Sequence, residues 1–312
     1  MILEELLDRL TLLDADRESL KAKRRFSDEV LEKYRIRSSH AINAAVLHTM
    51  KNIHGLQAMM EAQLYEVNPN NPSIYLPQQQ LLHDRIIIPY TDIAGGVVKV
   101  RPHMLGFAGQ PARVFYTHAA RKKPPLCIIA ESEFKAIAAE QFGFAAIGIP
   151  GITTMSGKNW NYFAQELERV DAREYVIMFD NEIKWDPSLR KFKADWRKRY
   201  ETILYAFAMA KKVIMQGYQC RIATLPQEWM EQGKIDIDLA LAQGRTKEDF
   251  TKVVMASQSA DEYLKSAPIE KAHRTFIDKR IKSFFFQSAL EIKNNQFYTK
   301  DRMDKDGNIT PG

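Results

Sequence analysis

The sequence predicts an α/β fold: a parallel sheet of about four strands flanked by helices, preceded by a helical N-terminal region and a small β-rich subdomain. The main observation is that four short apolar runs alternate with helix-patterned segments: PPLCIIAE, FAAIGIPG, EYVIMFDNE and YQCRIATLP. Such alternation indicates βαβ units, whose parallel strands are covered on both faces. The second observation is composition, because 45% hydrophobic and 27% charged residues are typical of a folded globular protein.

Residues 1–80 form the predicted helical region. Apolar residues recur at three and four spacing, as on one face of a helix, in LEELLDRLTLL, FSDEVLEKYRI and AINAAVLHTMKNIHGLQAMMEAQLYEV. The following VNPNNPSIYLPQQQ is rich in proline and asparagine, and we expect a connector there. The opening MILEELLDRL is charged and helix-patterned, unlike a signal peptide.

Residues 81–123 form the predicted β subdomain. RIIIPYTDIAGGVVKVRPHM contains two β-rich runs around a polar Gly-Gly turn, which indicates a hairpin, and ARVFYTHAARKK adds another strand. A purely structural β-layer explains this pattern as well as a functional one does.

Residues 124–244 hold the main sheet, with helices predicted over SEFKAIAAEQFG, over NYFAQELERV and from about Asp195 to Gly217. Residues 245–312 form the C-terminal helix and tail. We expect one helix over TKEDFTKVVMASQSADEYLKS, and FFFQSALEI with NNQFY indicates a β-rich segment.

Composition excludes several classes of protein. The only cysteines, Cys127 and Cys220, sit in apolar runs, so neither a zinc ribbon nor a disulfide framework is expected, and a reducing, cytoplasmic location fits. The apolar runs are far shorter than a membrane span. A net charge of +6 favours polyanionic partners only mildly. No GxxxxGK[ST] motif occurs, so we do not expect the chain to be its own helicase.

Acidic residues follow two of the predicted strands directly. Glu131 follows CIIA, Asp180 follows VIMF, and Glu182 comes two residues later. In parallel sheets the working groups collect at the carboxyl ends of the strands. A carboxylate there is costly unless it is paired or binds a metal, and converging carboxylates favour Mg²⁺ or Mn²⁺. The alternative is that these acids cap helices or pair with Lys135 and Lys184.

The segments around these acids resemble a known family signature. IIAESEFKAIAAEQFGFAAIGIPG followed by VIMFDNE resembles the Toprim signature, with a glutamate after the first strand, a glycine-bearing turn after the second and an acidic D-x-D-type motif after the third. ESEFKA resembles the E-G-x-x-K form of plasmid and phage primase-like proteins. RIIIPYTDIAGGVVKVRPHM is similar to the segment before Toprim in bacterial primases, and LKAKRRFSDEVLEKYRIRSS resembles the opening of mobile-element replication proteins.

The resemblance spans roughly residues 15 to 245 and implies a Toprim-type core. Two departures stand out: Ser132 replaces the usual glycine, and the third motif is Asp-Asn-Glu. No zinc-binding module of the kind that bacterial primases carry is present. The Asp-Asn-Glu motif and the absence of this zinc module favour two alternatives to primer synthesis. One is a Toprim nuclease, and the other is a non-catalytic module that binds DNA or a helicase.

Resemblance to primases implies nucleotidyl transfer from NTPs on single-stranded DNA, with a replicative helicase as a partner. Glu131, Asp180 and Glu182 would then hold one or two Mg²⁺ or Mn²⁺ ions. Lys135 would act on a phosphate, or pair with Glu131 instead. Arg101 would reach a phosphate from the hairpin, or be an ordinary surface arginine.

Two further groups are candidates for binding. Basic residues interleave with Trp185, Phe192 and Trp196, which is typical of a single-strand groove but equally of a solvent-facing helix; they include Lys184, Arg190, Lys191, Arg197 and Arg199. KIDIDLALAQG resembles the G-x-D-D-L-L stretch of these proteins, so Asp238 is a candidate for an outer metal site. The alternative for Asp238 is the N-cap of the helix that follows.

Overall fold

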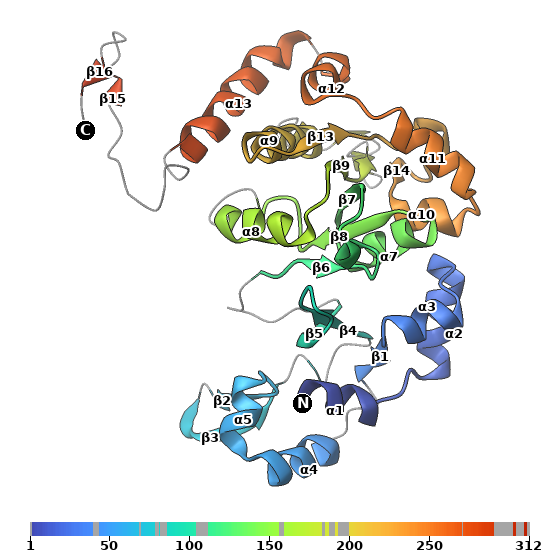
Figure 1. Cartoon of the computed structure of the whole chain (residues 1–312), viewed down its shortest axis with the longest axis vertical. Helices are drawn as coiled ribbons and strands as arrows, with labels where there is room; N and C mark the ends of the chain where they lie inside the picture. Colours follow the sequence, from blue (N-terminus) through green and yellow to red (C-terminus); the bar gives the residue numbers. More distant parts are fainter. Residues whose placement is uncertain are drawn as a thin grey trace.

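The computed structural model describes residues 2–39, 44–68, 70–78, 81, 86–103, 112–155, 159–182, 185–186, 191–192, 200–269, 271–289, 302–303 and 309–310. In Figure 1 the main sheet lies in the middle of the molecule, with the N-terminal elements on one side and the C-terminal helices on the other. Within the described part of the chain, no helix is both long enough and apolar enough to cross a membrane.

The predicted parallel sheet is confirmed. Its strand order is β13-β9-β7-β8-β6. The parallel strands are β7 (Leu126–Glu131), β8 (Ala145–Ile149), β9 (Glu174–Met178) and β13 (Gln219–Ile222). A short fifth strand, β6 (Phe115–Tyr116), pairs with β8 in the antiparallel direction.

Helices cover both faces of this sheet, as the alternating strand residues require. The connecting helices are α7 (Glu133–Gln141), α8 (Trp160–Val170) and α9 (Glu201–Met215). Ile128 of β7 packs in one core with α7, whereas its neighbour Ile129 packs in a second core with α8 and α9. Successive strand residues point to opposite faces, so a strand buried on both sides must be apolar throughout.

The order of strands creates a switch point. The chain leaves β7 for β8 on one side and later returns to place β9 on the other side. In open α/β sheets, ligands bind in the crevice at the carboxyl ends of the two strands where the order reverses. The topology therefore predicts a ligand site at the carboxyl ends of β7 and β9.

Among its described residues, the predicted helical N-terminal region contains five helices: α1 (Ile2–Arg9), α2 (Asp14–Arg24), α3 (Asp28–Lys33), α4 (Ala44–His54) and α5 (Leu56–Glu61). The predicted β4–β5 hairpin (Ile86–Thr91 and Val97–Pro102) is also present, and β1 (Arg37–Ser38) pairs with it.

The connector predicted over residues 67–80 is wrong, because β2 (Tyr65–Asn68) and β3 (Asn71–Pro77) form a hairpin there. The Asn68 side chain accepts a hydrogen bond from the Asn70 amide and turns the chain. Prolines are tolerated because β3 is an edge strand.

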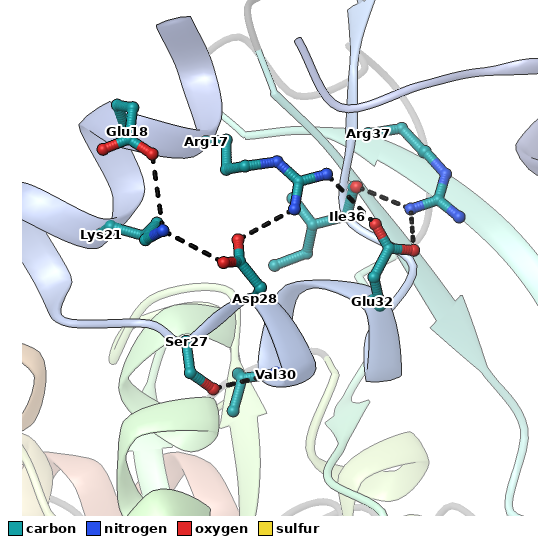
Figure 2. Close-up of polar contacts among 9 residues, drawn as sticks. All are labelled: Arg17, Glu18, Lys21, Ser27, Asp28, Val30, Glu32, Ile36 and Arg37. Atoms are coloured by element: carbon teal, nitrogen blue, oxygen red, sulfur yellow. Dashed lines mark hydrogen bonds and ion pairs between the residues drawn. The ribbon is translucent and has the colours of Figure 1, made fainter. Parts of the chain in front are cut away.

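Ion pairs link the helices of the N-terminal region to each other (Figure 2). Arg17 and Lys21 of α2 bind Asp28 at the start of α3, with N–O distances of 2.9 and 3.1 Å. Glu32 of α3 binds Arg17 at 3.5 Å and Arg37 of β1 at 3.3 Å. The network therefore bridges α2, α3 and β1 on the outside of the molecule.

The C-terminal part differs from expectation in two ways. Instead of one helix there are two, α11 (Lys247–Met255) and α12 (Ala260–Ser266), because Ser259 forms a capping box with Glu262 and starts a new helix. FFFQSA is helical, within α13 (Arg274–Ala289), where we expected a β-rich segment; NNQFY lies outside the described residues. The described residues also form α10 (Ile237–Ala242) and the short strands β10 (Asn181–Glu182), β11 (Trp185–Asp186), β12 (Lys191–Phe192), β14 (Lys234–Ile235), β15 (Arg302–Met303) and β16 (Ile309–Thr310).

Candidate active site

Glu131 and Asp180 lie on either side of the switch point. Glu131 is the last residue of β7, opposite Ile149 of β8, and Asp180 comes two residues after the end of β9. Two acids that are far apart in the sequence thus reach the same edge of the sheet. Their positions follow directly from the parallel strand order.

A tight turn separates Glu131 from α7. Ser132 has a φ of 100°, a backbone conformation that favours glycine, and its amide donates to the Ile149 carbonyl at 2.9 Å. A Cβ on Gly148 would lie 2.5 Å from the Ser132 carbonyl oxygen, so only glycine fits there. The serine therefore occupies a strained position directly beside the candidate carboxylate.

Glu131 lies in a setting that disfavours its charge. Burial raises the pKa of Glu131 above its ordinary value, and the charge of Asp180 adds to this effect. Lys135, a hydrogen bond from the Ile152 amide and Lys234 act in the opposite direction. The effect of Asp180 on the pKa of Glu131 means that the two carboxylates lie within electrostatic reach of each other.

Two lysines neutralise the acids at this edge. Lys135 of α7 binds Asp180 and lies 3.8 Å from a carboxylate oxygen of Asp236. Lys234 of β14 lies 2.9 Å from Asp180 and 3.1 Å from Asp236. We call these four residues, Lys135, Asp180, Lys234 and Asp236, the lysine–carboxylate cluster. Lys135 therefore pairs with Asp180, which agrees with the alternative that these acids pair with Lys135, and its contact with a phosphate stays a prediction.

Asp236 has a second task, as the N-cap of α10. Its side chain accepts from the Leu239 amide at 2.9 Å. Burial acts to raise the pKa of Asp236, but Lys135, this amide and Lys234 together lower it below its ordinary value. Burial likewise acts to lower the pKa of Lys234, and Asp180 and Asp236 outweigh it and raise that pKa. For both Asp236 and Lys234, the nearby opposite charges thus outweigh burial and favour the ionised form.

Asp238 is not the N-cap, so that alternative is wrong. It lies in the first turn of α10, where it is buried and binds Arg24 of α2. The guanidinium of Arg24 also stacks over Phe134 of α7, 4.5 Å from the ring centre. Asp238 therefore joins the N-terminal region to the main sheet, and its role in an outer metal site stays a prediction.

Arg101 of the β4–β5 hairpin lies against the start of α7. It binds Glu133, whose side chain is almost fully buried, and the hydroxyl of Tyr90 at 3.1 Å; Tyr90 in turn donates to Glu133. Lys99 and Arg113 lie close enough to interact electrostatically with this arginine. Burial and the positive charges of Arg101 and Arg113 lower the pKa of Lys99 to about 8. We call Lys99, Arg101 and Arg113 the basic group.

Several predicted site residues fall outside what the structure describes. The backbone of Glu182 lies in β10, paired opposite Lys234 of β14, but its side chain is outside the described residues. The same holds for the side chain of Lys191 and for all of Lys184, Arg190, Arg197 and Arg199. The predicted single-strand groove therefore stays a prediction.

The donor chemistry at the edge suits Mg²⁺ or Mn²⁺, since carboxylate oxygens are the ligands that these ions prefer. Among the described residues, however, no three acidic, histidine or cysteine side chains are already gathered around one point. Oxygens of Asp180 and Asp236 are instead held by lysine ammonium groups. Glu131 and Asp180 fit a metal ion if Asp180 exchanges its lysines for it.

Two residues of the site, Lys234 and Asn181, were not predicted, and Asp236 was considered beside Asp238 but not selected. Lys234 and Asp236 are two apart in an extended segment, a spacing that places both side chains on one side. That K-x-D pattern before a helix was the available signal. Asn181 donates from Nδ2 to the Leu225 carbonyl at 2.7 Å and thereby fixes the segment after β9; its position inside D-N-E does not distinguish it.

Comparisons with known proteins bear on the fold. No family model matches the chain, and no curated protein sequence matches it. The structure is similar to the crystal structure of the RNA polymerase domain of Mycobacterium tuberculosis primase DnaG, with a TM-score of 0.56 and 15% identity, over 91% of this chain and 88% of that one.

Two structures of bacteriophage T7 proteins also match, both with TM-scores of 0.34. One is a lagging-strand DNA polymerase with primase domains of two gp4 subunits, at 15% identity over 56% of this chain and 79% of that one. The other is the primase fragment of the T7 primase-helicase, at 13% identity over 64% and 70%. The likeness to the Mycobacterium tuberculosis domain, with its TM-score of 0.56 and 15% identity, concerns the fold alone, and on that basis the chain has a primase-like fold.

Proposed function

We propose that this chain is a primase-type DNA replication protein that joins nucleotides from NTPs on a single-stranded DNA template. The observation that carries the proposal is the position of Glu131 and Asp180 at the switch point of a primase-like sheet. A purely structural sheet has no need for two acids there, because each is costly to bury. Acids held at such a point are typical of phosphoryl-transfer chemistry.

In the proposed reaction, the 3′-hydroxyl of a growing strand attacks the α-phosphate of an incoming NTP, and pyrophosphate leaves. Glu131, Asp180 and Glu182 would hold Mg²⁺ or Mn²⁺, which neutralises phosphate charge when bound. Lys135 and Lys234, once released from Asp180, bring two ammonium groups to the same edge for the triphosphate. Their contribution is positioning and charge neutralisation, which dominate this class of reaction.

Template binding is assigned to basic side chains near the site. The basic group supplies three cations near the start of α7, where Glu133 pairs with Arg101. We expect Lys184, Arg190, Lys191, Arg197 and Arg199 to contribute further cations; their side chains lie outside the described residues. A replicative helicase partner is part of the same proposal.

A second candidate is a non-catalytic module that binds DNA. The observation that favours it is the lysine–carboxylate cluster itself, in which Lys135 and Lys234 already balance Asp180 and Asp236. Such a site keeps its fold and charge balance without a metal ion.

The test is a gel assay with single-stranded templates, labelled NTPs and Mg²⁺ or Mn²⁺. The variant is Asp180→Asn, and the matched control is Asp171→Asn, an exposed acid that binds Lys123 at the other end of the sheet. We expect short labelled oligonucleotides from the wild type and from Asp171→Asn, and none from Asp180→Asn. Cleavage of the DNA would favour a nuclease over a primase. Binding of DNA without any product would favour the non-catalytic binding module.

A further inference from the structure

A cavity of about 540 Å³ lies next to the lysine–carboxylate cluster, between the start of α9, the end of β13 and α12. Asp180 and Asn181 form part of its wall. We propose that this cavity is a nucleoside subsite, which holds the base of an NTP while its phosphates lie against Lys135 and Lys234. The inference rests on the proposed function for the phosphates and adds a specific site for the base.

The position of the cavity supports this assignment. Asp180 contacts both lysines of the cluster and also lines the cavity, so the two sites share one residue. Asn181 is held to the Leu225 carbonyl, which keeps the segment after β9 against the end of β13. A ligand with a flat ring and a phosphate chain can therefore span both sites at once.

The lining also suits a heterocyclic base. Ligand sites typically measure about 300–1,000 Å³ and combine apolar walls with a few polar groups. Here the walls include Phe179, Ile203 and Leu225, against which a flat ring can pack. Polar groups stand between them, and a base needs such donors and acceptors at its edge.

Gln258 is the best-placed of these polar groups. Its backbone pairs with Ile222 at 2.8 and 2.9 Å, which fixes its position beside β13. Its side-chain carbonyl accepts from the Ser266 hydroxyl at 3.1 Å, so its amide NH₂ is the group left to donate. Thr202 adds a hydroxyl from the first turn of α9.

The experiment compares NTPs with inorganic tripolyphosphate, which carries the phosphates but no base. Dissociation constants are measured by calorimetry with Mg²⁺ for the wild type, for Thr202→Tyr, which fills the cavity, and for Gln258→Met, which removes the amide. Matched controls are Thr251→Tyr on α11 and Gln216→Met, an exposed residue at the end of α9. Circular dichroism melting checks that each variant is folded.

We expect NTPs to bind more tightly than tripolyphosphate to the wild type. Thr202→Tyr should weaken NTP binding about tenfold or more, the value of one lost base contact, and leave tripolyphosphate binding unchanged. Gln258→Met should weaken NTP binding by a smaller factor and alter the preference among the four bases. Both controls should match the wild type.

Each other outcome has a definite meaning. Equal binding of NTPs and tripolyphosphate, unaffected by Thr202→Tyr, overturns the nucleoside subsite and leaves the phosphate site standing. Binding of unphosphorylated nucleosides that Thr202→Tyr abolishes, without any tripolyphosphate binding, supports the subsite and overturns the proposed function. If the wild type binds none of these ligands, both proposals fall.

Discussion

Two regions of this molecule pair acids with bases, and they differ in burial. In the N-terminal network, the side chains of Asp28 and Glu32 are 54% and 53% exposed. In the lysine–carboxylate cluster, Asp180, Lys135 and Asp236 are only 10%, 11% and 12% exposed, whereas Lys234 is 44% exposed. Both regions pair carboxylates with lysine or arginine cations, so any difference in their contribution to stability follows from the difference in exposure to water.

The difference in burial determines how much each set of ion pairs contributes to the stability of the fold. Exposed pairs are screened by water and stabilise a fold by about 0–1 kcal/mol. Buried charges pay for their desolvation, and removing one partner leaves the other uncompensated at a cost of several kcal/mol. A buried cluster of this kind adds little net stability over apolar side chains. Its presence at the switch point is therefore not explained by stability alone, which supports the proposed function.

Replacing Lys135 should have the largest effect on stability. Lys135→Met leaves Asp180 buried with only Lys234 as a counter-charge, so we expect the free energy of unfolding to fall by about 3 kcal/mol. Urea denaturation followed by circular dichroism measures this. A loss below about 1 kcal/mol would mean that the cluster is as well solvated as the surface network.

Lys99 should give a pH-dependent effect on DNA binding. Its pKa of about 8 means that it loses its positive charge as the pH rises from 7 to 9. We expect wild-type affinity for single-stranded DNA to fall about fivefold more over this range than that of Lys99→Met, the value of one phosphate contact. Fluorescence anisotropy at constant salt measures it, with the exposed Lys252→Met on α11 as control.

The same lowered pKa predicts the sign of a stability change. Folded Lys99 releases its proton near pH 8, whereas the unfolded chain keeps it up to about 10.5. The unfolded state thus binds more protons in this window, and stability should rise with pH relative to Lys99→Met. Parallel stability profiles for the two proteins would contradict the assignment.

Ser132 should give a smaller effect of opposite direction. Ser132→Gly relieves a backbone conformation that a serine adopts only under strain, at the entropic cost of a more flexible unfolded chain. The net result expected is a gain of about 1 kcal/mol in thermal or urea unfolding. A loss of stability would mean that the serine hydroxyl makes a compensating contact.

Replacing Arg17 should have the smallest effect, although it removes contacts to both Asp28 and Glu32. For Arg17→Met we expect a loss of less than about 0.5 kcal/mol, which salt reduces further. Paired with Lys135→Met in one denaturation series, it tests the comparison directly. Similar losses in the two variants would remove the distinction between the regions.

Much of this architecture could be predicted from the sequence, because local patterns determine it. The apolar runs locate the four parallel strands, and the residue after each run locates Glu131 and Asp180 at one edge. Helix α7 ends close to its predicted glycine, since that residue adopts a positive φ (Gly143, 92°). These features depend on periodicity and on backbone chemistry over a few residues.

What the sequence could not supply depends on distant partners or on a shift of one or two residues. Lys234 meets Asp180 only because β10 and β14 pair, and no local pattern encodes that pairing. The N-cap role that was an alternative for Asp238 belongs to Asp236, because α10 begins two residues earlier than that alternative requires. Both acids suit an N-cap, and only packing against Arg24 separates them.

The pairing of β10 with β14 has a consequence for the order of folding. It closes a long segment that contains α9 and β13, so contacts of high sequence separation complete the site. Glu131 and Asp180 can meet when β7 and β9 associate, yet Lys234 and Asp236 arrive only with that closure. We therefore expect the Leu239 amide at the start of α10 to gain protection later than the Ile128 amide in pulsed hydrogen exchange. Simultaneous protection would mean that the charged edge and the sheet form in one step.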